Sequence, residues 1–191
     1  MRTRLVSVAK AVSVVAIATG LLFGAGTAAT AAPAPSVPAA AFALGQPVVG
    51  RSDILVDPAA VESLGYFGIQ SLVIGGRVQT VNGQTTQTFD VVGNPNDGTV
   101  EHRGALLLTT PDGVEVWWSL VIDKNRGVLT GYENLSRRID LFTLGAPTSA
   151  GAPLVLTQAG ADALNRNLGF DELFSQGFVY GYVKTTLNPA V

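Results

Sequence analysis

The sequence predicts a mainly β protein: one antiparallel β-sandwich, immunoglobulin-like or similar, with a short N-terminal helix and a second helix before the last strand. Short runs of alternating apolar and polar residues fill the region from residue 69 to residue 144. Turn sequences such as Asn82-Gly83 and Pro111-Asp112-Gly113 separate these runs. Tight turns at this spacing indicate an antiparallel sandwich or barrel, of which we expect the sandwich, with about seven or eight strands.

The first 31 residues are typical of a cleaved secretory signal peptide. A basic start (Arg2 to Lys10) precedes an apolar run from Ala11 to Gly26, and Ala29-Thr30-Ala31 has the small residues that signal peptidase requires. The apolar run is interrupted by Ser, Thr and Gly, and is shorter than a membrane span of about 20 residues. We therefore expect a secreted, extracellular or cell-wall-associated protein with no membrane span after cleavage.

Residues 32–50 are predicted to be a flexible lead-in. They are rich in Pro and Ala and contain no charge until Arg51. Such a segment suits either a spacer that holds a domain away from a cell wall or an ordinary disordered N-terminus. Its last residues are candidates for an edge strand, and residues 51–191 are predicted to form a single domain.

Composition excludes several classes of function. The 160 residues after position 31 carry nine cationic and 14 acidic side chains, a net charge of −5, and no basic stripe for nucleic acid. There is no cysteine, which excludes disulfides, thiol nucleophiles and cysteine-ligated zinc.

Two helices have clear end signals. Asp57 can cap a short helix that starts at Pro58 and ends near Gly65. Thr157 and Gly169 bound the second helix, in which Ala161, Leu164 and Leu168 share one face. The expected strands are residues 69–81, 84–92, 99–109, 114–123, 128–132, 138–144, 154–156 and 177–187.

Trp117 and Trp118 are adjacent in the strand 114–123, so strict alternation places their rings on opposite faces. Trp118 shares its register with Leu120 and Ile122, which predicts that Trp118 enters the core. Trp117 is then either a platform for a sugar ring or protein partner, or a residue covered by the second helix.

No catalytic or metal-binding residue stands out. His102 is the only histidine, which excludes multi-histidine metal sites, and no G-x-S-x-G motif is present. Most acidic residues outside the helices fall in turns, where turn chemistry explains them. His102 is either a hydrogen-bonded structural residue or a ligand contact. The candidate ligand-binding residues are His102, Trp117, Tyr132, Tyr180 and Tyr182.

Two resemblances extend this interpretation. The segments GTVEHRGALLL (98–108) and LVLTQAGADALNRNLGF (154–170) resemble an uncharacterised family of secreted actinobacterial β-rich proteins. The chain departs from that pattern at Ala105, where a second glycine is usual. The order of strands, L-T-x-x-G/A-A motif and aromatic closing strand is also similar to the HtaA haem-binding domains of actinobacterial surface proteins.

The HtaA resemblance implies haem held by a tyrosine with a supporting histidine. Here His102 would be that histidine, and the candidate ligands are Tyr66, Tyr132, Tyr180 and Tyr182. The family's N-terminal W-x-x-x-x-S-x-x-x-Y stretch is not found, so the ligand tyrosine has no matching position.

We expect an exported, non-enzymatic, envelope-associated protein with a binding, structural or adhesive role and no obligatory cofactor. Its partner is an envelope component or a small ligand of unknown identity. The alternatives are an HtaA-like protein that binds haem or another small ligand, and a secreted hydrolase.

Overall fold

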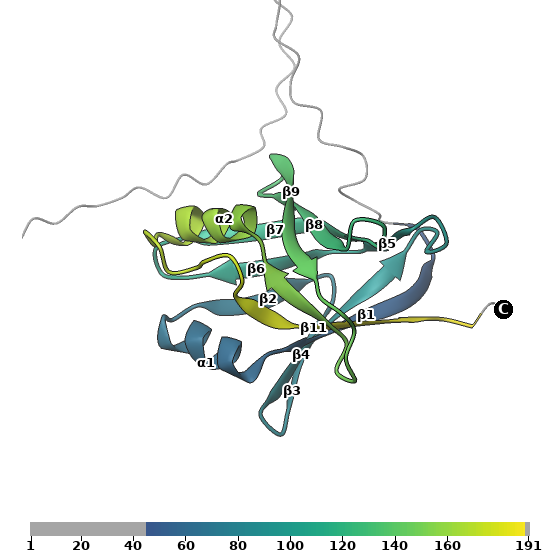
Figure 1. Cartoon of the computed structure of the whole chain (residues 1–191), viewed down its shortest axis with the longest axis horizontal. Helices are drawn as coiled ribbons and strands as arrows, with labels where there is room; N and C mark the ends of the chain where they lie inside the picture. The colour runs from purple at the N-terminus through teal and green to yellow at the C-terminus, as the bar shows by residue number, and fades with distance from the viewer. Residues whose placement is uncertain (1–44, 190–191) are drawn as a thin grey trace, which may run out of the picture. The chain divides into compact units, whose positions relative to one another are not determined.

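A computed structural model describes residues 45–189. The predicted signal peptide and the lead-in up to residue 44 lie outside the described residues, and both stay predictions. The described part contains two helices and eleven strands (Figure 1). The helices are α1 (Pro58–Tyr66) and α2 (Gln158–Leu168). The strands are β1 (Val48–Val56), β2 (Gln70–Ile74), β3 (Arg77–Val81), β4 (Gln84–Val92), β5 (Thr99–His102), β6 (Ala105–Thr109), β7 (Val114–Asp123), β8 (Val128–Glu133), β9 (Arg137–Leu144), β10 (Ala152–Leu156) and β11 (Val179–Leu187).

The strands form one antiparallel sheet that closes into a barrel. Eight of them follow each other around the ring in the order β7-β5-β4-β1-β11-β10-β9-β8, and β8 pairs again with β7. β6 and β2 continue the sheet beside β7, and β3 pairs with β4. The mainly β antiparallel class with two helices is confirmed, whereas the predicted sandwich of two separate sheets is replaced by this closed barrel. Closure depends on pairs such as β1 with β11, which are far apart in sequence.

The barrel begins before the predicted domain boundary. β1 starts at Val48, so the predicted boundary at Arg51 falls inside a strand. β1 pairs with β4 on one edge and with β11 on the other, so it is a central strand and not the predicted edge strand.

Glycines divide two segments that the sequence predicted as continuous strands. The chain turns at Gly75-Gly76 between β2 and β3, and a Cβ on Gly76 would meet the Thr88 carbonyl oxygen at 2.3 Å. Gly104 (φ +99°) separates β5 from β6, where a Cβ would meet the Ile74 carbonyl oxygen at 2.0 Å. Only glycine fits backbones that approach this closely. The predicted Asn82-Gly83 hairpin is present between β3 and β4, with φ of 51° and 77°.

The predicted orientation of the tryptophan pair was wrong. Trp117 is 0% exposed and belongs to the core, whereas Trp118 is only half-buried. Ser119 has a φ of 52°, and the pairing of β7 with β8 shifts between Trp118 and Val121. This bulge reverses the alternation within β7, so Trp117 and Leu120 are both buried.

Both helices begin at their predicted caps, and α1 runs one residue past the predicted terminator Gly65, to Tyr66. The Asp57 side chain accepts from the Ala59 N–H at 2.9 Å, and that of Thr157 accepts from the Gly160 N–H at 3.0 Å. α2 ends at Gly169 in the left-handed conformation and packs against β7 and β9.

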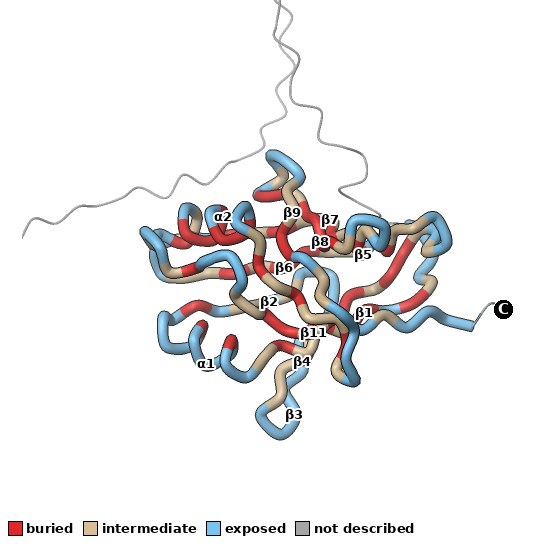
Figure 2. Tube along the Cα trace, viewed as in Figure 1, coloured by how far each residue is buried: buried red, intermediate tan, exposed pale blue. Residues whose placement is uncertain are grey.

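The barrel interior is closely filled by side chains. The Trp117 ring packs edge-on against Phe142 at 5.5 Å between ring centroids, and Phe142 lies 5.6 Å from Tyr180. Figure 2 shows that buried positions run along the strands of the ring, while the β3–β4 hairpin tip is exposed. Within residues 45–189, neither helix has the length and apolarity to cross a membrane.

Candidate functional site

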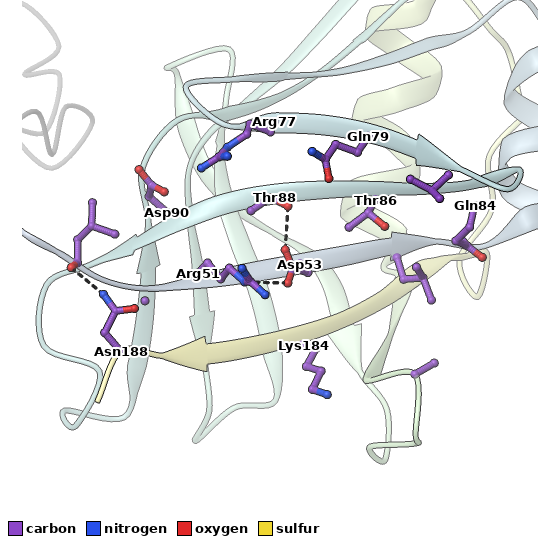
Figure 3. Close-up of a pocket in the computed structure, with 15 residues that line it drawn as sticks. Arg51, Asp53, Arg77, Gln79, Gln84, Thr86, Thr88, Asp90, Lys184 and Asn188 are labelled. Carbon is purple, nitrogen blue, oxygen red and sulfur yellow. Dashed lines mark hydrogen bonds and ion pairs between the residues drawn. The ribbon is translucent and has the colours of Figure 1, made fainter. Parts of the chain in front are cut away.

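A groove of about 620 Å³ lies on the outer face of the sheet, across β3, β4, β1 and β11 (Figure 3). One row of cross-strand partners crosses it: Arg77 pairs with Thr88, Thr88 with Asp53, and Asp53 with Lys184. Partners in an antiparallel sheet point to the same face, so this row places four polar side chains along one line. The volume is within the range of small-ligand sites.

Amide and hydroxyl groups line the rest of the groove. Gln79 pairs with Thr86 in the next row, and Gln84 and Asn188 lie toward opposite ends (Figure 3). These side chains both donate and accept hydrogen bonds, so the groove suits a polar ligand.

The two carboxylates of the groove are already engaged by the protein. Asp53 Oδ2 lies 3.2 Å from Arg51 Nε, and Asp53 Oδ1 accepts from the Thr88 hydroxyl at 2.8 Å. Asp90 Oδ2 lies 3.8 Å from Arg103 Nη1. Two cations thus balance the two carboxylates of this region.

Arg77 and Lys184 differ from every other cation in the part of the chain that the structure describes. Nine lysines and arginines are present there, and seven contact an acidic, carbonyl, hydroxyl or aromatic group. These are Arg51, Arg103, Lys124, Arg126, Arg137, Arg138 and Arg166. Within residues 45–189, Arg77 and Lys184 have no such partner, and both line the groove. The charged residues that line the groove are three cations and two carboxylates, a net charge of +1, and two of the three cations form no ion pair with a described residue.

His102 is a structural residue within the barrel. It is 5% exposed, its Nδ1 lies 3.0 Å from the Leu120 carbonyl oxygen, and its Nε2 lies 2.7 Å from Ser52 Oγ. Burial lowers the pKa of His102 to about 4, so the ring is neutral. Because a carbonyl only accepts, Nδ1 carries the proton and Nε2 accepts from Ser52. Ser52 is 1% exposed, so this serine–histidine pair has no access to a substrate.

The Tyr180 hydroxyl closes a ring of buried hydrogen bonds. It donates to Gln87 Oε1 at 3.0 Å, Gln87 Nε2 donates to Ser71 Oγ at 2.8 Å, and Ser71 lies 2.7 Å from the Tyr180 oxygen. Burial raises the pKa of Tyr180 to about 12. The ring joins β11, β4 and β2, which gives Tyr180 a structural role.

The remaining predicted residues lie apart from one another. Trp117 is fully buried, while Tyr132 is half-buried on β8 with the Arg138 guanidinium 4.4 Å above its ring. Tyr182 is half-buried and pairs with Leu55, a residue that lines the groove. None of the five predicted residues lines the groove, and ligand binding by the five stays a prediction.

A second polar cluster joins α2 to the barrel. Glu115 is 0% exposed, and its Oε2 accepts from the side-chain amides of Asn134, at 3.1 Å, and Asn167 of α2. Burial, with a smaller contribution from Glu133, raises the pKa of Glu115 to about 7. Burial also opposes ionisation of Glu133, but hydrogen bonds from Arg137, Arg166 and Asn167 outweigh it and lower the Glu133 pKa. Because Glu115 has no exposure, the cluster is a structural contact and not a catalytic pair.

His102 and Tyr180 do not fit the haem site that the HtaA resemblance implies, whereas haem binding by Tyr66, Tyr132 or Tyr182 stays a prediction. Both nitrogens of His102 are occupied by Leu120 and Ser52, so the ring supports no tyrosine. The Tyr180 hydroxyl is enclosed by Gln87 and Ser71, and Tyr66 is 84% exposed on the surface of α1.

Sequence reasoning did not find the groove. Its floor combines Arg51, Asp53, Arg77 and Lys184, which come from three distant segments. Each is a polar residue at the outward position of a strand, as any solvated strand would have. Only the register between the strands brings them together.

Comparisons with known proteins identify one structural likeness. The chain is similar to the crystal structure of the C-terminal domain of HtaA from Corynebacterium glutamicum, with 16% sequence identity and a TM-score of 0.47. The match covers 72% of this chain and 95% of that domain. It agrees with the distant HtaA likeness stated from the sequence, but at this level it transfers no ligand and no residue role. No family model and no curated protein matches the sequence, so membership of the uncharacterised secreted family stays a prediction.

Proposed function

We propose that the protein is an exported, envelope-associated binding protein that holds an extended polar ligand in the groove across β3, β4, β1 and β11. The observation that carries this proposal is the hollowed face itself, which is lined by hydroxyl, amide and charged side chains. The N-terminal sequence supports export.

A catalytic role has less support. The one serine–histidine pair, Ser52 with His102, and the carboxylate Glu115 are all buried. Ser52, His102 and Glu115 do not line the groove. The groove therefore has side chains that can bind a ligand but no buried acid, base or nucleophile next to it.

Cosedimentation with insoluble actinobacterial cell wall tests the proposal. Thr86 is half-buried at the centre of the groove between Gln79 and Leu55, so Thr86→Trp fills the groove with an indole ring. Thr143→Trp is the matched control, because Thr143 is exposed on β9 away from the groove. We expect the wild type and Thr143→Trp to sediment with the wall and Thr86→Trp to remain in the supernatant.

Two results would contradict the proposal. Wild-type protein that stays in the supernatant argues against an envelope ligand. Equal sedimentation of both tryptophan variants and the wild type places the binding surface elsewhere.

A further inference from the structure

We infer that the groove selects an anionic glycan, whose acidic groups pair with Arg77 and Lys184. This inference rests on the proposed function and adds the chemical class of the ligand. Both side chains are exposed and line the groove, and neither has a partner among residues 45–189.

The charge of the groove contrasts with that of the rest of the domain. The described chain carries a net charge of −5, which repels polyanions in general. Asp53 is paired with Arg51 inside the groove, and Asp90 with Arg103, which lies outside the groove lining. The charges of Arg77 and Lys184 therefore remain for a ligand, and this face attracts an anion that the remaining surface repels.

The spacing of the two cations indicates a ligand with more than one acidic group. Arg77 on β3 and Lys184 on β11 are separated by β4 and β1, which corresponds to about 14 Å between their backbones at three strand spacings. Figure 3 shows the two side chains on opposite sides of β4 and β1. A single small anion at one of these cations leaves the other unpaired. A chain that bears acidic groups at intervals pairs with both.

The floor of the groove favours a glycan over an acidic peptide. β4 and β1 are hydrogen-bonded to neighbours on both edges, so the floor offers no edge for an added peptide strand. β3 pairs only with β4 within the described chain, and a strand added to its outer edge would lie beside the groove and not across its floor. The available groups are side-chain amides and hydroxyls, including those of Gln79, Gln84 and Thr86. These groups match the hydroxyls of sugar rings.

Three polymers with one shared backbone test the inference: dextran, carboxymethyl-dextran and dextran phosphate. We expect the wild type to bind both anionic forms more tightly than dextran. That preference should fall as salt rises from about 10 mM to about 150 mM, because the Debye length shortens from about 30 Å to about 8 Å. Removal of both charges, in Arg77→Gln/Lys184→Gln, should weaken binding of the anionic forms about tenfold and leave binding of dextran unchanged.

The matched control is Lys124→Gln/Arg126→Gln, which changes the net charge equally in the turn between β7 and β8. Equal losses in the two double variants would show nonspecific attraction and overturn the inference. Equal binding of all three polymers by the wild type would also overturn it. If the three polymers bind equally but wall sedimentation still depends on Thr86, the inference fails and the proposed function stands. If the wild type also does not sediment with the wall, both fail.

Discussion

Glu115 should make the domain less stable as pH rises through neutrality. Its carboxyl is fully buried, and burial raises its pKa from 4.5 to about 7. Between these values the folded state holds a proton that the unfolded state has released. Stability therefore falls as pH rises through this window.

The change that isolates this effect is Glu115→Gln. Oε2 of Glu115 accepts from Asn134 and Asn167, and a glutamine oxygen accepts the same two bonds. Oε1 makes no hydrogen bond of normal geometry, and glutamine is the uncharged side chain closest in size and shape to the protonated acid. The free energy of unfolding of the variant should equal that of the wild type near pH 5 and exceed it near pH 8. At about 1.4 kcal/mol for each pH unit, the gain in the free energy of unfolding reaches about 3 kcal/mol.

Urea denaturation followed by tryptophan fluorescence, from about pH 5 to about pH 8, measures this gain. The difference between variant and wild type is the informative quantity, because the titration of His102 acts in the opposite direction over part of the range. Glu62→Gln, at an exposed position of α1, is the control for removal of one carboxylate charge. A Glu115→Gln difference that stays constant from acid to alkaline pH would refute the reasoning.

Three further predictions follow from the core and the helix cap. Trp117→Ala should cost about 3–5 kcal/mol in urea denaturation and Trp118→Ala clearly less, because only Trp117 is fully buried; equal losses would contradict the bulge at Ser119. The wild type should lose up to about 3 kcal/mol of unfolding free energy as pH falls from 6.5 to about 4, because the buried His102 ring resists protonation. His102→Gln should remove this loss, and an unchanged acid profile would argue against burial of the ring. Thr157→Ala should cost about 1 kcal/mol through loss of the cap on the Gly160 N–H, and Thr157→Ser should restore most of it when both are compared by thermal unfolding.

The local elements were predictable because local chemistry determines them. Asp57 and Thr157 cap their helices through their own side chains, and Asn82-Gly83 adopts the positive φ angles of a hairpin. These interactions span only a few residues, so composition and spacing contain the information.

The facing of residues within a strand was less predictable. Burial alternates on each side of Ser119, but the alternation changes phase across it, so the face predicted from Leu120 and Ile122 is wrong for the residues before Ser119. A bulge is set by pairing with the neighbouring strand, here the shift between β7 and β8, and leaves no clear signal in the strand's own residues.

The β class, the helix N-caps, the hairpin turns and the charge of the domain can all be read from the residues in order along the chain. Closure of the sheet into a barrel, and burial of His102 and Tyr180 in hydrogen-bonded networks, are visible only once the chain is folded. The groove also belongs to the tertiary structure, because Arg77 and Lys184 are more than 100 residues apart along the chain. Such groupings depend on sheet register, because pairing between strands far apart in sequence sets which side chains share a face.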